Sequence, residues 1–304
     1  MKKKKIVLLG GGHGLSSVIK AFISEEYDTS IIVSTTDNGG HTGMLRCEFD
    51  IPALGDIRRC LSTITDNQLL KNFLDFRFDK IHDVDNLSLG NLMLLSLLME
   101  NDLETSLLKL KKDLNLKATI LPALNYSCDI CAKYEDETII QGEINIPSKK
   151  KIKDIFYPSK TYITDTVKET LTNADYIMIS PGSLYTSILP ILAISDIKKI
   201  LKRSKAKIIY ISNIMTQNGE TDNFSILDAT KVIEKKINRK INNIISSCSI
   251  IDHKKREKYS YDLSFPTKPS EDSRIIYAPL VDDNDEYIRH DYRLVKETFD
   301  KIKK

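Results

Sequence analysis

Four short segments combine glycines with polar or charged side chains, as loops that bind phosphorylated ligands do. The first reads Gly-Gly-Gly-His-Gly-Leu-Ser over residues 10–16 and follows an apolar run. Glycines let backbone N–H groups approach a phosphate, and the start of a helix favours negative charge. The dinucleotide fingerprint is only approximated, because Ser17 stands at its third glycine position. A tight turn without a ligand is the alternative, but we expect phosphate contacts from Gly11, Gly12, His13 and Gly14.

The second segment reads Thr-Asp-Asn-Gly-Gly-His-Thr-Gly over residues 36–43. Asp37 lies 23 positions after Gly14, where an acid often contacts a ribose hydroxyl. A plain Asp-Asn turn is the alternative, since both residues tolerate turn geometry. The expected ligand-binding residues here are Asp37, Asn38, Gly39 and Gly40.

The third segment, residues 52–59, carries Asp56, Arg58 and Arg59. Asp56 could simply cap the helix that follows. The two arginines could grip phosphates in pairs of hydrogen bonds, or be surface charges. If the chain were a transferase, Asp37 and Asp56 would be its candidate catalytic pair and could hold Mg²⁺ between phosphates. Otherwise we expect no metal and no required cofactor.

The fourth segment reads Ser-Pro-Gly-Ser-Leu-Tyr-Thr-Ser over residues 180–187. It follows a buried apolar run and opens a helix, so it is a second phosphate-type loop; a serine that only caps the helix is the alternative. Gly182, Ser183, Tyr185 and Thr186 are the expected contacts. Two such loops in one sheet favour a ligand with two anionic or polar ends.

Alternating strands and helices would position these loops. Apolar and β-branched runs predict strands over 4–9, 29–36, 176–180, 207–212, 241–251 and 274–280. Helical spacing predicts helices over 15–23, 55–65, 68–76, 88–100, 104–114, 164–173, 196–203, 225–237 and 291–303, with another from residue 184 onward. Residues 37–55 read as a long loop. This is an α/β fold: a three-layer, Rossmann-like parallel sheet with helices on both faces, which binds its ligand at the carboxyl ends of the strands.

The alternation of strands and helices is interrupted once, over residues 118–158. This stretch predicts a small β-rich insertion within a single domain spanning 1–304. A hairpin is expected there around Glu135-Asp136-Glu137.

Composition and charge argue against nucleic-acid-binding, secreted and membrane-spanning classes of protein. The formal net charge of +3 does not indicate a nucleic-acid binder. The apolar runs are too short for a signal peptide or a membrane span, and five scattered cysteines suit a reducing compartment. We therefore expect a cytoplasmic protein.

The loops together resemble the YvcK-type gluconeogenesis factors, in a superfamily with the 2-phospho-lactate transferases. The motifs stand in family order almost from end to end: the glycine loop, residues 36–46, Gly55-Asp56-Ile57-Arg58, residues 88–92, 181–187 and 213–221, and Tyr287-Ile288-Arg289-His290-Asp291. Residues at five positions depart from the family pattern: His13, His41, Met44, Leu87 and Tyr292.

The resemblance implies support of growth on gluconeogenic carbon sources and a role in cell shape and cell-wall synthesis, with an unidentified protein partner. It also implies binding of a UDP-sugar such as UDP-N-acetylglucosamine or UDP-glucose. Arg289 matches the family's ligand-contacting arginine, and a guanidinium suits a diphosphate. The motifs add Arg58, Asn91, Asn213 and Thr216 to the expected ligand-binding residues.

Three functions compete at this point. The first is a UDP-sugar-sensing regulator that is not an enzyme. The second is a Mg²⁺-dependent transferase of a phosphorylated group, like the 2-phospho-lactate transferase. A nicotinamide-dependent oxidoreductase is the third and weakest, because the dinucleotide fingerprint is incomplete. Assembly into a homo-oligomer stays open.

Overall fold

Continuous apolar runs form a seven-stranded parallel sheet in the computed structural model, which describes residues 3–79, 86–146, 150–261, 264–282 and 285–303. The spatial order is β10-β9-β8-β7-β1-β2-β3, so the chain adds strands to one side of β1 and then crosses to the other. Ligands bind at such a reversal in open parallel sheets. The strands are β1 (Lys4–Gly10), β2 (Tyr27–Val33), β3 (Ala118–Pro122), β7 (Tyr176–Ile179), β8 (Lys207–Ile211), β9 (Asn243–Ser247) and β10 (Ile275–Ala278).

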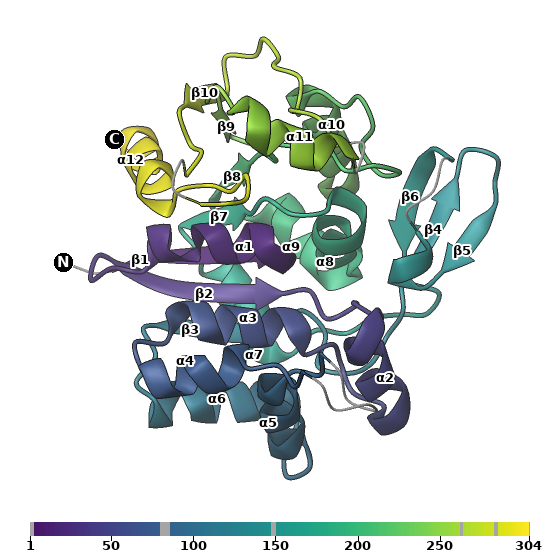
Figure 1. Ribbon diagram of the computed structural model, residues 1–304, viewed down its shortest axis with the longest axis vertical. Coiled ribbons are helices and arrows are strands. Elements are labelled where there is room, and N and C mark those ends of the chain that lie inside the picture. Colours follow the sequence, from purple (N-terminus) through teal and green to yellow (C-terminus); the bar gives the residue numbers. More distant parts are fainter. Residues whose placement is uncertain (1–2, 80–85, 147–149, 262–263, 283–284, 304) are drawn as a thin grey trace.

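Side chains along each strand alternate between two hydrophobic cores, because neighbouring residues face opposite sides of a sheet. In β1, Ile6 and Leu8 join one core and Val7 and Leu9 the other. Helices cover both faces (Figure 1), which confirms the predicted three-layer α/β fold. One face carries α1 (Gly12–Val18), α3 (Gly55–Ile64) and α12 (Tyr292–Ile302); the other carries α7 (Asp165–Thr172), α8 (Leu189–Ala193), α9 (Ser195–Arg203) and α10 (Ile226–Ile237).

Three further helices lie between α3 and β3: α4 (Gln68–Asp75), α5 (Leu89–Leu98) and α6 (Leu103–Asp113). Each begins where its sequence supplies a capping side chain, since Asn67, Ser88 and Asp102 all accept a hydrogen bond from a first-turn N–H. One more helix, α11 (His253–Tyr261), precedes β10. No described helix is long and apolar enough to span a bilayer.

The predicted insertion contains a small antiparallel sheet of order β5-β4-β6, which lies beside the carboxyl ends of the large sheet (Figure 1). Its strands are β4 (Cys131–Tyr134), β5 (Ile139–Gln141) and β6 (Ile152–Phe156). The expected hairpin is present, with Cys131 opposite Gln141. Residues 118–122, however, form β3 of the large sheet. They are a continuous, mostly buried apolar run, as parallel strands are.

The prediction of a long loop over residues 37–55 is wrong, because α2 (Gly40–Phe49) occupies most of it. Three glycines and several polar residues hide the helical signal, and tertiary contacts override weak propensity. Arg46 on this helix is buried and donates to the carbonyl oxygens of Thr36 and Asp37 and to the carboxylate of Asp129. Arg46 therefore ties α2 to the end of β2 and to the insertion.

Candidate functional site

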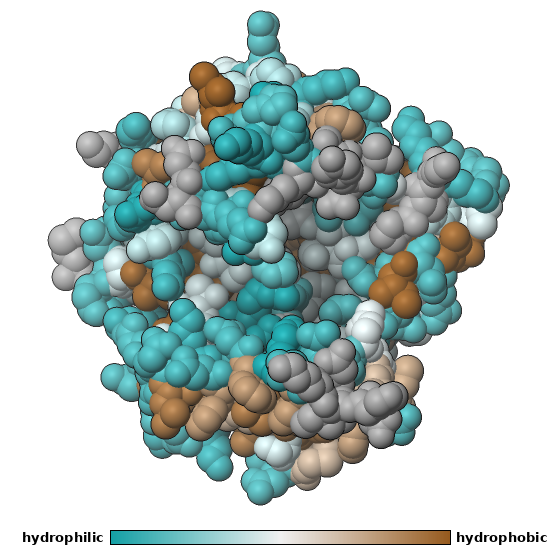
Figure 2. Space-filling view, viewed as in Figure 1, coloured by the Kyte–Doolittle hydropathy of each residue, from teal (hydrophilic) through white to brown (hydrophobic). Residues whose placement is uncertain are grey.

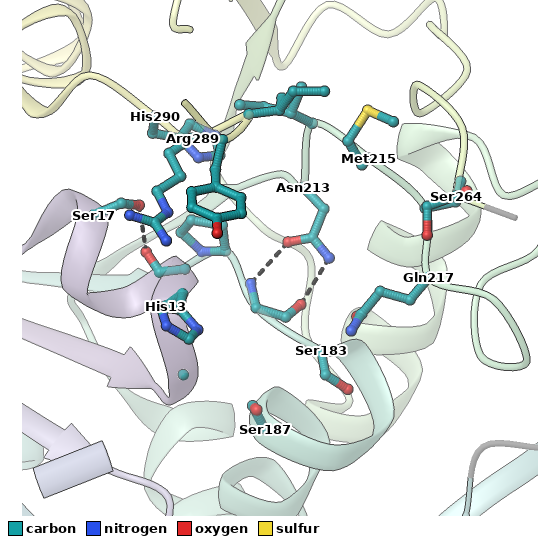
Figure 3. A pocket seen from close by; sticks show the side chains of 18 residues that line it. His13, Ser17, Ser183, Ser187, Asn213, Met215, Gln217, Ser264, Arg289 and His290 are labelled. Carbon is teal, nitrogen blue, oxygen red and sulfur yellow. Dashed lines mark hydrogen bonds between the residues drawn. The ribbon is translucent and has the colours of Figure 1, made fainter. Parts of the chain in front are cut away.

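A cavity of about 690 Å³ opens at the carboxyl ends of β1, β7 and β8, beside the point where the strand order reverses (Figure 3). Pockets for small molecules have volumes of a few hundred to about 1,000 Å³. Three chain segments form its walls: the start of α1, the turn after β7, and the segment after β8. The stretch 287–290 closes the cavity from the C-terminal side.

The glycine turn after β1 already holds an anion from the chain itself. The N–H of Gly12 donates to Oδ2 of Asp56 at 2.6 Å, and Arg59 donates to Oδ1 of the same carboxylate at 2.6 Å. Asp56 therefore caps α1 and not its own helix, whose N-cap is Leu54. The backbone N–H that we expected to face a phosphate is occupied, and Gly11 lies against Asp56 and outside the cavity wall.

The turn after β7 is held in place by a side chain from the segment that follows β8. Asn213 accepts from the N–H of Gly182 at 2.8 Å and donates to its carbonyl oxygen at 2.7 Å (Figure 3). Gly14 packs against this turn so closely that a Cβ would stand 2.3 Å from the carbonyl oxygen of Pro181. Asn213 is thus a positioning residue, and the two glycine turns form one rigid floor.

Arg289 points from the C-terminal segment toward Ser17 and the start of α1 (Figure 3). Its guanidinium stacks on the ring of Tyr287, 4.8 Å from the centroid, and pairs with Asp285 at 3.4 Å. Partial enclosure, together with the positive charges of Arg59, Arg289 and Arg58, lowers the pKa of His13 to about 4. His13 is therefore neutral at physiological pH and can accept or donate a hydrogen bond in the cavity.

Two carboxyl groups beside the cavity hold their protons more tightly than usual. Glu220 accepts from Ser183 Oγ and, at 3.3 Å, from the N–H of Tyr185. Burial raises its pKa despite these bonds. Burial and the charge of Asp37 raise the pKa of Glu143 to about 7. Sequence reasoning missed both residues, since a lone glutamate gives no signal without its distant partners.

The second predicted loop lies outside the cavity. Asp37 accepts from the N–H of Gly39 at 2.9 Å, the Asp-Asn turn that was the alternative. Asn38 accepts from the N–H of Ile144 at 3.0 Å and so contacts the insertion. Gly39 and Gly40 start α2. These residues line neither the cavity nor its entrance, so here they join α2 to the insertion.

Several other expected contacts are also elsewhere. Arg58 donates to the carbonyl oxygen of Leu74 at 2.8 Å and lines a separate cleft. Asn91 is buried at the start of α5. Tyr185 and Thr186 are buried in a π-helical turn, Leu184–Ile188, just below the cavity. Of the expected residues, the cavity is lined by Gly12, His13, Gly14, Gly182, Ser183, Asn213, Thr216 and Arg289.

An apolar wall completes the cavity and was not foreseen. Ile214, Met215 and Ile288 line it, with Gln217 nearby. The sequence indicated these residues only by their position within the family motifs, next to Asn213 and Arg289. The cavity therefore offers a cation, polar groups and an apolar surface, as a ligand with an anionic part and a flat or apolar part requires.

Residues 6–280 match the model of the family described as "2-phospho-L-lactate transferase CofD". The Bacillus subtilis gluconeogenesis factor is 33% identical over 95% of this chain and 95% of its own length. The chain belongs to the gluconeogenesis factor family, within the wider CofD family. A Halalkalibacterium halodurans gluconeogenesis factor is 39% identical over 77% of this chain and 74% of its own length.

The fold of this gluconeogenesis factor family member is also found in solved structures. A crystal structure of a Bacillus halodurans protein superposes with a TM-score of 0.92 at 34% identity, covering 97% of this chain and 99% of that one. The similarity to this relative therefore extends from the sequence to the arrangement of the sheet, the helices and the insertion.

Proposed function

We propose that this protein is a regulatory factor that binds a UDP-sugar, such as UDP-N-acetylglucosamine or UDP-glucose, in the cavity above β1 and β7. The observation that carries the proposal is that Arg289 and an apolar surface line the same cavity of about 690 Å³. The guanidinium suits a diphosphate, while Ile214, Met215 and Ile288 offer a surface for the base or sugar.

The cellular part of the proposal follows the family. We expect a cytoplasmic factor that supports growth on gluconeogenic carbon sources and contributes to cell shape and cell-wall synthesis through a protein partner. The name of the curated relatives supports the first role.

Thermal unfolding tests the ligand. UDP-N-acetylglucosamine, UDP-glucose, NAD, ATP and GTP would be compared, each at about 100 times its dissociation constant where binding occurs, which adds roughly 2.7 kcal/mol. Arg289→Ala should lose the stabilisation by UDP-sugars. Arg203→Ala, an exposed arginine in the last turn of α9, should keep it. No shift of the melting temperature with any UDP-sugar would refute the proposal.

A transferase of a phosphorylated group is the second candidate, favoured by the match to the transferase family and by two carboxyl groups near the cavity, Glu143 and Glu220, whose pKa values are raised. Both oxygens of Asp56 accept hydrogen bonds, from Gly12 and Arg59, so a Mg²⁺ ion held by Asp37, Asp56 and phosphate oxygens would share this carboxylate with them. Release of phosphate-containing product from a phosphorylated donor, measured with and without Mg²⁺, would favour this candidate.

A further inference from the structure

A second cleft lies next to the cavity, on the outer side of α1. It has a volume of about 570 Å³ and is bounded by α1, α3, α4 and residues of the C-terminal segment, namely Asp282, Asp285, Arg289, His290 and Tyr292. His13 and Arg289 line both spaces and stand between them. We refer to this space as the basic cleft. Figure 2 shows hydrophilic side chains across α1 and α3, whereas hydrophobic ones gather over α4 and α5.

Positive charge is concentrated in the basic cleft. Six cationic side chains line it, against three aspartates. This local excess of positive charge would attract an anion. The six are Lys20, Arg58, Arg59, Lys71, Arg77 and Arg289.

Carboxylates pair with three of the six cations, namely Arg58, Arg59 and Arg289. Asp75 is held by Arg58 and by Ser62 Oγ, which donates at 2.7 Å. Lys20 and Lys71 form no ion pair with a carboxylate among the described residues. These two ammonium groups remain available to a ligand.

Arg58 gives independent evidence that the cleft is built for an anion. Its side chain is only 7% exposed, and its Nε is buried without a hydrogen-bond partner in the described structure. Burial, followed by the charges of Arg59 and Arg77, lowers the pKa of its guanidinium. Holding like charges together in a partly buried place costs free energy, which a bound anion would offset.

We propose that the basic cleft is a second anion-binding site, which takes the phosphate or diphosphate group of a small phosphorylated ligand. Guanidinium groups bind phosphate oxygens in pairs, and lysines add point charges. The volume admits a small metabolite. The site shares His13 and Arg289 with the cavity assigned above to a UDP-sugar, whereas Lys20, Arg58 and Lys71 line the basic cleft alone.

Titration calorimetry with pyrophosphate would test the proposal on the full chain. The double variant Lys20→Ala/Lys71→Ala removes two surface charges from the cleft. The matched control, Lys198→Ala/Lys202→Ala, removes two from α9 on the opposite face of the sheet. We expect the cleft variant to bind pyrophosphate about tenfold more weakly, because hydrogen bonds to charged groups contribute about 1.5–3 kcal/mol each and surface exposure reduces this. The control should bind as the wild type does.

The outcomes separate this site from the cavity. Pyrophosphate should still bind, through Lys20, Arg58 and Lys71, when UDP-N-acetylglucosamine saturates the protein and engages Arg289. Equal affinities in the two double variants, no binding of pyrophosphate to the wild type, or complete loss of pyrophosphate binding in the presence of the UDP-sugar would each overturn the proposal. If no UDP-sugar binds, the UDP-sugar proposal fails, and the comparison of lysine variants still decides this one.

Discussion

Asn213→Asp should destabilise the protein, because one of the two hydrogen bonds between Asn213 and Gly182 would be replaced by repulsion between two oxygen atoms. The aspartate can still accept from the N–H of Gly182. Its second oxygen would replace the Nδ2 that now donates to the Gly182 carbonyl oxygen at 2.7 Å. Loss of one hydrogen bond costs about 1 kcal/mol and an unpaired carbonyl about 1–3 kcal/mol more. We expect a total of about 2–4 kcal/mol, or roughly 3–6 °C in melting temperature for a chain of this length.

Asn242→Asp is the matched control, since it makes the same change of charge in the same fold. Asn242 Oδ1 accepts from the N–H of Ile208 at 2.8 Å, a role that a carboxylate keeps. The control should therefore lose less than about 1 kcal/mol.

The pH dependence of Asn213→Asp gives a second measurement. Only a protonated carboxyl group can donate to the Gly182 carbonyl oxygen, so the pKa of the introduced aspartate in the folded protein should lie above the unfolded value of about 3.9. The penalty is then present above the folded pKa and fades as the pH falls through it. Melting curves at pH 8 and pH 5 should show the variant approaching the control at the lower pH. Equal melting temperatures for the two variants at pH 8 would refute this role of Asn213.

Three further predictions concern other parts of the site. Gly14→Ala should lower the melting temperature by several degrees, because a Cβ would overlap the neighbouring turn at a cost of about 1–3 kcal/mol. The control Gly55→Ala should be nearly neutral, because the nearest neighbour of the added Cβ is a side-chain atom at 3.2 Å. The pKa of Glu143 is raised to about 7, so the folded protein keeps this proton at pH values where the unfolded chain has released it. The free energy of unfolding measured in urea should therefore decline between pH 5 and pH 8. In Glu143→Gln this decline should be smaller. Arg46→Met should cost about 3 kcal/mol in urea unfolding, since it leaves two carbonyl oxygens and the carboxylate of Asp129 without their buried partner.

Each of these has a result that would contradict it. Equal melting temperatures for Gly14→Ala and Gly55→Ala would mean that the two turns are not in tight contact. A pH profile unchanged by Glu143→Gln would assign the decline to other groups. A loss below about 0.5 kcal/mol in Arg46→Met, as at an ordinary surface site, would show that α2 does not depend on this arginine.

The layers of the fold could be predicted from sequence because each rests on a local pattern. Runs such as Ile6–Leu9 are apolar throughout, as strands buried on both faces must be. Helix α10 carries both halves of its capping box in the sequence, Ser225 and Asp228. Helix α2 was missed because its glycines argue against a helix and its stabilising contacts come from distant residues, among them Asp129.

The site could be predicted only in outline, for the same physical reason. The glycine turns are local and were found. Their partners are not local: Asp56 lies 44 positions from Gly12, and Asn213 lies 31 from Gly182. Polar residues near the turns were therefore expected to face a ligand, whereas several of them hold the turns in place. No spacing rule connects such pairs before the strand order is known.

The carboxylate of Asp56 at the start of α1 has a consequence for selectivity. This carboxylate competes with any ligand phosphate for the N–H of Gly12. Because it is part of the same chain, its effective concentration is fixed and does not depend on the ligand concentration. A ligand that placed its phosphate on the Gly12 amide would have to displace this carboxylate and separate it from Arg59. A ligand that brings its charge to Arg289 and offers only hydroxyl groups to the glycine turn avoids that cost. If the proposed ligand binds here, the turn would discriminate between phosphorylated molecules by the position of their charge and not by its amount.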